Sequence, residues 1–340
     1  TIRGGVLGGY KGCIVLEDSS DVTIEGVRFD GWYGQRLKST EFAGDPSDSL
    51  SPHENDRGEW LENYGAAISA TNCRGLRVHS CRGRRGQNGV LLTRSQDCEV
   101  YDNDFSFLSG WGLGMYRSSE CVVAHNILDY CVRGYSHGRY GQAQRAAGIL
   151  MLDGCSKNLV VRNSATHCGD GVFVHGGQGI TQDASSRAAG CDQNIFAEND
   201  LRFSAASSVE IALSDRNAVL RNDLRGAHQH GVLGSYASRM IVLGNRIEQV
   251  VGGGVTIAHG QECLIADNAI ARNEIGLALY WDEDPEFAAG PYSRVKDVRS
   301  RDHFVLENSF EDNVVDLALQ RSTGLTFHGN EYVPGTRAPY

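Results

Sequence analysis

One asparagine recurs at nearly constant spacing along most of this chain, and this repeat constrains the fold more than any other feature. The gaps between successive copies are 23, 37, 36, 23, 23, 23, 40 and 22 residues, so most equal one unit of 22 or 23 residues and three contain an insertion. A fixed period of this size is typical of a solenoid, in which each repeat packs only on its neighbours. The repeat asparagines are Asn103, Asn126, Asn163, Asn199, Asn222, Asn245, Asn268, Asn308 and Asn330. We therefore predict one elongated domain over residues 1–340.

Each repeat has the pattern of three short strands separated by turns. A glycine opens the first strand, and the residues one and three positions after it are apolar, as in Gly171-Val-Phe-Val. Side chains alternate across a strand, so these two positions are expected to point inward. A second strand places an apolar residue three before the asparagine, such as Val219, and a third places one two after it, such as Leu224. The pattern predicts an all-β, single-stranded parallel β-helix of about eleven rungs over residues 5–333.

The asparagines and cysteines are both expected to stack from rung to rung. Stacked asparagine amides would satisfy backbone groups in the turns of neighbouring rungs, and the alternative is that these residues are simply exposed turn residues. Three of the ten cysteines, Cys98, Cys121 and Cys263, lie five residues before a repeat asparagine. We interpret the cysteines as small buried side chains rather than as disulfides or metal ligands. No Cys-X-X-Cys pair indicates a zinc site.

Composition argues against two kinds of partner. The formal net charge is −10 and no basic stripe is visible, so nucleic acid is not an expected partner. No run of 18 apolar residues is present, so no membrane-spanning helix is expected. The chain begins at Thr1 within a turn-and-strand pattern, and a leader or a cap before it could have been removed. The oligomeric state is not predicted.

The rung pattern, the aligned asparagines and glycines, and the stretch HCGDGVFVHGG from His167 resemble the right-handed parallel β-helix superfamily. This group includes pectate-lyase-like enzymes and a domain class shared by carbohydrate-binding proteins and sugar hydrolases. The resemblance covers residues 5–333 and implies the fold, but the same scaffold carries several activities. The chain contains neither the Asp-Pro-His-Asp motif of alginate epimerases nor the Arg-Ile-Lys motif of polygalacturonases. No specific catalytic set is therefore transferred from the family.

Four insertions indicate which face of the solenoid carries the function. Residues 30–64 and 130–147 fall before the strand that opens with glycine, and residues 177–190 and 281–297 fall just after it. Insertions at both ends of one strand would form walls on two sides of its sheet. Insertions gathered on one face of a solenoid usually mark the binding face. We predict a groove along the helix axis, with its floor on this sheet.

The outward positions of this sheet carry acids, histidines and aromatic residues. The candidate catalytic residues are Glu210, Asp170, Asp153, His175 and His259. The candidate substrate-binding residues are Arg94, Tyr116, Arg117, His230, Tyr236, Tyr280 and Trp281, together with His137, Arg139 and Tyr140 in a possible lid. Outward aromatic rings are the usual platforms for the apolar faces of sugars. For each residue the alternative is an inert position, such as a turn aspartate or a solvated imidazole.

Neighbouring rungs lie about 4.8 Å apart, so residues at one position on adjacent rungs touch. Tyr236 and His259 are such a pair. Asp153 is placed to orient His175 and to raise the pKa of its imidazole. Asp170 and Glu210 are one rung and about three residues apart, which puts their Cα atoms roughly 11 Å from each other. Their carboxyl groups could reach the separation of about 6.5–9.5 Å that an inverting glycosidase needs.

Three functions compete. The first is glycoside hydrolysis of a poly- or oligosaccharide, with Glu210 and either Asp170 or Asp153 as the acid–base pair. The second is a polysaccharide lyase or C5-epimerase, which needs a base and a cationic or metal group that neutralises the uronate carboxylate. The candidates for these roles are Arg94, Arg117, His175, His259 and Tyr236. No lysine lies among the groove positions and the chain is acidic, which favours hydrolysis of a less charged glycan. The third is a non-catalytic carbohydrate-binding or structural β-helix. The expected location is extracellular or periplasmic.

No cofactor is predicted, and one cation site is considered. Asp282 and Asp284 lie in an acidic loop whose oxygens are of the type that calcium prefers. A solvated loop is the simpler interpretation of these residues.

Overall fold

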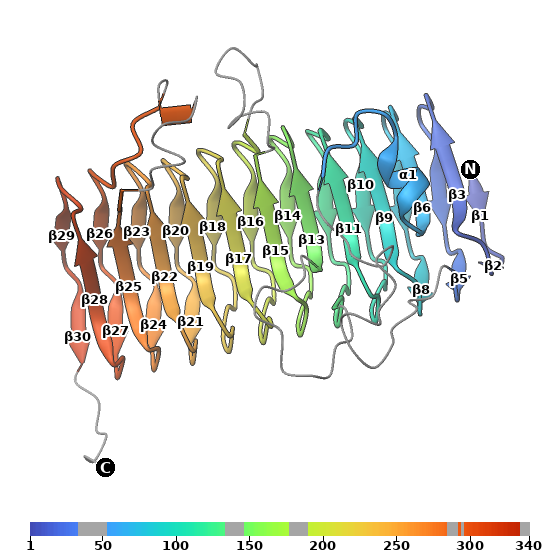
Figure 1. Cartoon of the computed structure of the whole chain (residues 1–340). Helices are drawn as coiled ribbons and strands as arrows, with labels where there is room; N and C mark the ends of the chain where they lie inside the picture. Colours follow the sequence, from blue (N-terminus) through green and yellow to red (C-terminus); the bar gives the residue numbers. More distant parts are fainter. Residues whose placement is uncertain (33–52, 133–145, 177–189, 284–291, 294–295, 334–340) are drawn as a thin grey trace, which may run out of the picture.

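The computed structural model describes residues 1–32, 53–132, 146–176, 190–283, 292–293 and 296–333. In these ranges the chain winds as a parallel β-helix, with successive turns stacked along one axis (Figure 1). The N-terminal strands lie at one end of the stack and the C-terminal strands at the other. Neighbouring strands pair in parallel and in register throughout this part of the chain, as in the pairing of Val172 with Val209. The predicted fold is confirmed.

The main face is an eleven-stranded sheet in the described residues, which we call the long-strand sheet. Each of its strands has six residues and begins at or just before the repeat glycine position. The number of strands agrees with the predicted number of rungs. The strands are β3 (Gly12–Glu17), β6 (Ala66–Thr71), β9 (Asn88–Thr93), β11 (Trp111–Tyr116), β13 (Ala147–Leu152), β15 (Asp170–His175), β17 (Ser207–Ala212), β19 (His230–Ser235), β22 (Gly253–Ala258), β25 (Ile275–Tyr280) and β28 (Val315–Gln320).

A second sheet holds the short strands that precede the repeat asparagine. These are β1 (Ile2–Arg3), β4 (Thr23–Glu25), β7 (Arg77–His79), β10 (Glu99–Tyr101), β12 (Val122–Ala124), β14 (Leu159–Val161), β16 (Ile195–Ala197), β18 (Ala218–Leu220), β20 (Ile241–Leu243), β23 (Leu264–Ala266), β26 (Phe304–Leu306) and β29 (Thr326–His328). Most of them place one buried residue at the centre of three, such as Val219 in β18. The period-2 alternation read from the sequence is therefore present in the structure.

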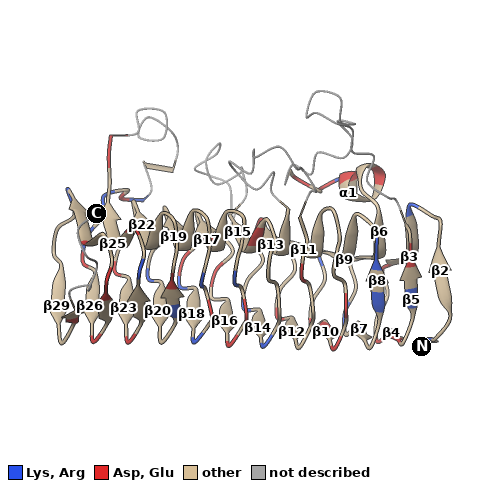
Figure 2. Ribbon diagram, turned by 90° about the horizontal axis from the view of Figure 1, so that it is seen from below, with Lys and Arg blue, Asp and Glu red and all other residues tan. Residues whose placement is uncertain are grey.

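The third face follows the asparagine and is regular only at its two ends. One end holds β2 (Val6–Gly8), β5 (Arg28–Asp30) and β8 (Arg82–Arg84), and the other holds β21 (Arg246–Glu248), β24 (Ala269–Ala271), β27 (Ser309–Glu311) and β30 (Glu331–Val333). Between them isolated bridges continue the register from Arg82 through Asp104 to Arg246. One short helix, α1 (Glu59–Asn63), lies beside the long-strand sheet (Figure 2).

The repeat asparagines form one ladder, as predicted. Each side-chain amide donates to the carboxamide oxygen of the next asparagine, and the distance from Asn222 Nδ2 to Asn245 Oδ1 is 3.0 Å. The same Nδ2 donates to the carbonyl of Phe196 on the preceding rung, at 2.9 Å. The oxygen of Asn245 also accepts from the backbone N–H of Asn222. The Asn222 side chain thus bonds to polar groups on the preceding rung and on the following rung. The ladder runs through Asn103, Asn126, Asn163, Asn199, Asn222, Asn245, Asn268, Asn308 and Asn330.

The interior is a continuous apolar core along the axis. Its members include the inward residues of the long strands, such as Val172, Val174 and Val209, which are fully buried. All ten cysteines carry free thiols, and all but Cys13 are buried. They pack as small apolar side chains, as the repeat predicted. Within the described ranges, no helix has the length and apolar sequence that a membrane crossing requires.

Candidate functional site

The outward face of the long-strand sheet presents the first, fourth and sixth residues of each strand. The third and fifth residues, such as Val172 and Val174 of β15, belong to the interior core. The second is the corner position usually held by glycine, and a Cβ on Gly171 would meet Leu201 and the Ser208 carbonyl. Parallel register then aligns each outward position into a column that runs along the solenoid. The columns decide which side chains of distant rungs become neighbours.

Two carboxylates, one hydroxyl and one imidazole gather on three successive rungs of this face. Asp170 is the first residue of β15, Ser207 the first of β17 and His230 the first of β19. Ser207 and His230 are register partners, and the backbone N–H of Ser207 donates to Asp170 Oδ1 at 2.9 Å. Glu210, the fourth residue of β17, is the register partner of Phe173 in β15. The predicted juxtaposition of Asp170 and Glu210, one rung and three residues apart, is present.

The environment of Asp170 favours its protonated form. The side chain is 2% exposed, and burial raises its pKa well above the usual range for an aspartate. The negative charge of Glu210 raises the pKa further, while the hydrogen bond from Ser207 acts in the opposite direction. Glu210 itself is only partly buried. One carboxyl group is therefore held dry and proton-retaining beside another that reaches solvent.

Ser207 was not predicted from the sequence. Its hydroxyl is fully buried and has no hydrogen-bond partner in the described structure. Buried hydroxyl groups are nearly always bonded, so an unpaired one between an acid and a histidine points to a site that handles polar groups. A sequence signal for Ser207 exists: it directly precedes Ser208, which occupies the corner position that glycine usually holds, so Ser207 is the first outward residue of its strand.

The two histidines near this group differ in their surroundings. His230 Nδ1 lies 3.1 Å from Thr256 Oγ1, and burial lowers the pKa of His230, which favours the neutral imidazole. His175, the sixth residue of β15, is partly exposed and its ring packs parallel to that of Phe173, with centroids 6.2 Å apart. Both histidines point away from the core on the same face as Glu210.

The N-terminal half of this face is covered. A second apolar cluster forms there on the outside of the solenoid, around Trp60 and Tyr64 from the segment that carries α1. Trp60 packs on Trp111 with ring centroids 4.9 Å apart, and on Tyr116 at 5.7 Å. Tyr116 is fully buried, and its hydroxyl group bonds to Asp56 Oδ1 at 3.1 Å. Burial raises the pKa of Tyr116. The prediction that Tyr116 is an open platform for a sugar is wrong, because its ring is packed under Trp60.

Asp153 and Arg117 close the edge of this cover. The Asp153 side chain is 6% exposed and pairs with Arg117 at 2.7 Å, and Arg117 also reaches Asp56 Oδ1 at 2.5 Å. Arg94 donates to the carbonyl of Asp56 at 3.2 Å. The contact between Asp153 and His175 is a backbone hydrogen bond, in which the N–H of Asp153 donates to the carbonyl of His175 at 3.0 Å. These contacts connect the turns that hold Arg94, Arg117 and Asp153 to segment 53–64. Because Asp153 is buried and paired with Arg117, we leave it out of the acid–base pair.

The predicted contact between Tyr236 and His259 is confirmed, since their rings stack with centroids 4.3 Å apart. His259 is only 6% exposed because other groups cover it. Its Nδ1 donates to the Val298 carbonyl at 3.0 Å, and its Nε2 lies 3.0 Å from Asp282 Oδ1. The imidazole thus fastens both ends of the last insertion to the sheet.

The remaining candidates lie near the C-terminal edge or outside the described residues. Trp281 Nε1 donates to the Arg321 carbonyl at 2.8 Å, and burial raises the pKa of Tyr280. His137, Arg139, Tyr140 and Asp284 lie outside the described residues. The described ends of the insertions join the long strands at their two ends, as predicted; for example, Ala146 precedes β13 and Gly190 follows β15. The groove, the lid and the calcium site stay predictions.

Comparisons with known proteins agree with this architecture. A family model described as the right handed beta helix region matches residues 2–182. A second model, described as periplasmic copper-binding protein (NosD), matches residues 169–337. No curated protein matches the chain by sequence.

Solved structures share the fold at low identity. The A-module of mannuronan C-5 epimerase AlgE6 from Azotobacter vinelandii has a TM-score of 0.63 and 12% identity, over 92% of this chain and 75% of that one. The periplasmic alginate epimerase AlgG has a TM-score of 0.63 and 11% identity, over 97% and 76%. A mutant of DFA-IIIase from Arthrobacter chlorophenolicus A6, in complex with DFA-III, has a TM-score of 0.52 and 12% identity, over 88% and 69%. At this identity the likeness shows a right-handed β-helix and nothing finer.

The copper named by the second family model requires a donor set. Among the residues that the structure describes, no three His, Cys, Asp or Glu side chains gather where one metal ion could be held. All the thiols but that of Cys13 are buried, and His230, His259 and His303 lie on successive rungs but at different positions of the rung: at the start of β19, after β22 and before β26. The described residues do not fit a copper ion, and we derive no step through one.

Proposed function

Because this chain belongs to the right-handed β-helix family, we propose that it is a carbohydrate-active enzyme whose site is the middle of the long-strand sheet. Its substrate class is a poly- or oligosaccharide. The AlgE6 and AlgG structures carry the names of epimerases that act on mannuronan and alginate, and the DFA-IIIase structure holds the saccharide DFA-III. Their fold supports a carbohydrate substrate for this chain. We also propose a periplasmic or extracellular location, because NosD and AlgG are both periplasmic proteins.

The observation that carries the proposal is the pairing of Asp170 with Glu210. When the surroundings of two neighbouring titratable groups shift their pKa values apart, one group can act as the acid and the other as the base. Asp170 is dry and its pKa is raised, so it supplies the proton to the leaving oxygen. Glu210 is partly exposed on the next rung and takes a proton from the attacking water.

We propose glycoside hydrolysis as the reaction of this pair. The register gives Cα atoms roughly 11 Å apart, and side chains leaning toward each other bring the carboxyl groups near the ~6.5–9.5 Å separation of inverting enzymes. Ser207 lies in the same column as Asp170 and His230, and its backbone N–H holds Asp170 in place through Oδ1. His175 and His230 would position the ring on either side of the pair.

A lyase or C5-epimerase reaction is the second candidate. It is favoured by the likeness to two epimerases and by the neutral form of His230, which is the form a base requires. This reaction needs a cation against the uronate carboxylate. Arg117, predicted for that task, is committed to Asp153 and Asp56. For this reason we place it second.

A product assay with a matched variant tests both reactions. The parent protein is incubated with neutral and acidic glycans, and the products are examined for new reducing ends and for the ultraviolet absorbance of an unsaturated uronate. We expect reducing ends without that absorbance. Glu210→Gln should lower kcat by about 10²–10⁴-fold with an unchanged melting temperature. Glu262→Gln, an acid paired with Arg239 on another part of the surface, is the control and should keep full activity.

Other outcomes contradict parts of the proposal. An unsaturated product would replace hydrolysis by the lyase reaction. Full activity in Glu210→Gln would contradict the assignment of Glu210 and Asp170 as the acid–base pair. If the parent protein binds glycans but converts none of them, the protein is a carbohydrate-binding module and the enzyme proposal is wrong.

A further inference from the structure

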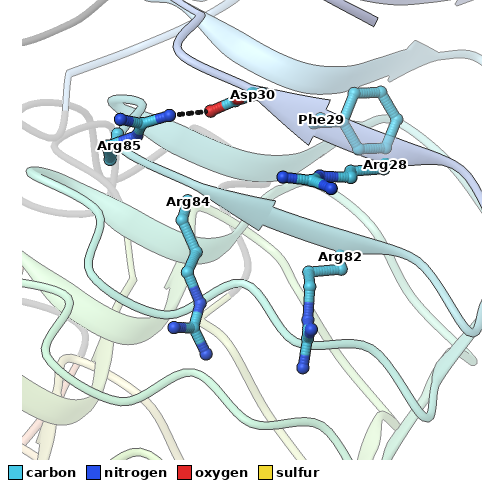
Figure 3. Close-up of a pocket in the computed structure, with 6 residues that line it drawn as sticks. All are labelled: Arg28, Phe29, Asp30, Arg82, Arg84 and Arg85. Carbon is cyan, nitrogen blue, oxygen red and sulfur yellow. Dashed lines mark hydrogen bonds and ion pairs between the residues drawn. The ribbon is translucent and has the colours of Figure 1, made fainter. Parts of the chain in front are cut away.

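Outside the long-strand sheet, a pocket of about 370 Å³ opens on the third face near the N-terminus (Figure 3). Its lining comes from β5 and β8 and from the turn after β8. The lining residues are Arg28, Phe29, Asp30, Arg82, Arg84 and Arg85. Four of the six are arginines, although the chain as a whole has a net charge of −10. Such a local reversal of charge needs a physical reason.

Internal carboxylates balance only part of this charge. Arg85 pairs with Asp30 at 2.5 Å, and Arg82 and Arg84 share one oxygen of Asp104, at 3.2 and 2.9 Å. Two carboxylates therefore face four guanidinium groups. Figure 3 shows Arg82 and Arg84 extending side by side from β8. The pocket retains two positive charges.

Arg28 is the least satisfied of the four. It is the register partner of Arg82 on the adjacent strand, and it forms no ion pair within the described residues. Like charges directly opposite each other on neighbouring strands are destabilising, so this pair would be relieved by an anion between them. Guanidinium groups hold the oxygens of carboxylates, sulfates and phosphates through paired N–H donors. The geometry suits an oxyanion.

A strip of aromatic rings continues from the pocket. Arg84 lies over the ring of Phe107, at 5.2 Å from its centroid. Phe107 stacks on Tyr130 at 4.9 Å, Tyr130 on His167 at 4.7 Å, and His167 packs on Phe203 at 5.0 Å. Phe107, Tyr130 and Phe203 are 51%, 41% and 46% exposed. Contiguous exposed aromatic surface marks an interaction site more often than single scattered side chains do.

The strip has a definite direction. Its residues occupy the turn that leads from the third face to the long strands, and each has a left-handed backbone, with φ between 56° and 60°. Bulky residues are uncommon in that conformation, so their repetition on four rungs is not a default choice. His167 lies three residues before Asp170, and Phe203 lies four before Ser207. The strip thus leads from the arginine pocket to the rungs of the acid pair.

We propose that the arginine pocket and the aromatic strip form a second binding site, for an acidic saccharide. A carboxylate or sulfate of the saccharide is held by Arg28, Arg82 and Arg84, and the rest of the chain lies along the exposed ring edges. A free inorganic oxyanion would use the pocket alone, whereas a saccharide uses both parts. The site stands on these contacts and does not depend on which reaction the long-strand sheet carries out.

Binding measurements in a Glu210→Gln background, where turnover is expected to be about 10²–10⁴-fold slower, test the site. The probes are an oligogalacturonate, a neutral maltooligosaccharide of equal length and inorganic phosphate. We expect the oligogalacturonate to bind at least about tenfold more tightly than either of the others, and its affinity to fall as salt is added. Phosphate binding as tightly as the oligogalacturonate would reduce the site to an ion pocket and overturn the saccharide assignment. Failure of the oligogalacturonate to bind would overturn the site itself.

Variants locate the binding. Arg28→Gln together with Arg84→Gln should weaken oligogalacturonate binding about tenfold or more. Arg28→Gln alone breaks no ion pair and should lower the affinity in the same direction with an unchanged melting temperature. Arg77→Gln is the control, because Arg77 is an exposed arginine paired with Glu99 on the second sheet. Equal affinity in the parent and in both pocket variants, or an equal loss in the control, would overturn the assignment.

Discussion

The two halves of the long-strand sheet share a backbone and differ in what their outward columns carry. Over β9, β11 and β13 the outward residues are mostly apolar, such as Leu91, Trp111 and Leu150, and they are buried beneath Trp60 and its neighbours. Over β15, β17 and β19 the same columns hold Asp170, Ser207, Glu210 and His230. The register does not change at the boundary. The difference therefore comes from side chains alone.

This contrast shows how one repeated scaffold supports two tasks. In the first half the outward columns add a second apolar core, which uses segment 53–64 as a lid and stabilises the solenoid from outside. In the second half the same positions hold groups that are poor core formers and good proton carriers. A buried acid next to a partly exposed one costs stability, and such sites are more often functional than structural. The predictions below test whether the halves are separable in this way.

The largest effect on stability is expected from the covered half. Trp60→Ala should lower the free energy of unfolding by about 3–5 kcal/mol, because a fully buried indole packed on Trp111 and Tyr116 is lost. Chemical denaturation measures the change. In folded protein, activity should fall much less than in Glu210→Gln. A Trp60→Ala protein with native stability but no turnover would show that the cover belongs to the site and would break the comparison.

The asparagine ladder should respond alike in both halves. Asn126→Ala and Asn222→Ala each leave backbone groups unpaired in a buried turn, and each should cost about 1–3 kcal/mol. The two losses, measured by thermal or chemical unfolding, should agree within experimental scatter. A much larger loss at one position would mean that the two halves also differ inside the solenoid.

The smallest effect concerns the pH dependence of stability. The folded pKa of Asp170 lies above its unfolded value of about 3.9, so the native state binds its proton more tightly than the unfolded state does. This contribution to stability is complete below about pH 4 and is lost as the pH rises through the folded pKa. Asp170→Asn keeps the acceptor for the Ser207 N–H and removes the titration. The variant should therefore gain stability relative to the parent as pH rises from about 4.

Unfolding curves across pH provide the measurement. If the parent and Asp170→Asn show parallel pH dependences, Asp170 is not the proton-retaining group and the acid role must move elsewhere. Asp30, whose pKa is lowered by its bond to Arg85, is a useful reference, because Asp30→Asn should change stability in the opposite direction over the acidic range.

The sequence alone determined the solenoid, since a period near 23 residues fixes how often the chain returns and the alternation of apolar residues fixes which side chains face inward. It also determined the asparagine ladder and the outward orientation of the Glu210 side chain, because both follow from the repeat period and from the alternation of side chains along a strand. A second asparagine ladder, Asn158 to Asn194 to Asn217, was not predicted, because cysteines replace asparagine in its column toward the N-terminus, where the backbone N–H of Cys121 donates to Asn158 Oδ1.

Only the tertiary structure decided which outward residues are free to act. Tyr116 and Asp153 have the same outward pattern in sequence as true site residues, but they are covered or paired by segment 53–64, more than fifty residues earlier in the chain. The unpaired hydroxyl of Ser207 and the excess charge of the arginine pocket are likewise visible only once neighbouring rungs are placed side by side. A repeat specifies positions, and the burial and charge of each position depend on what the rest of the chain places next to it.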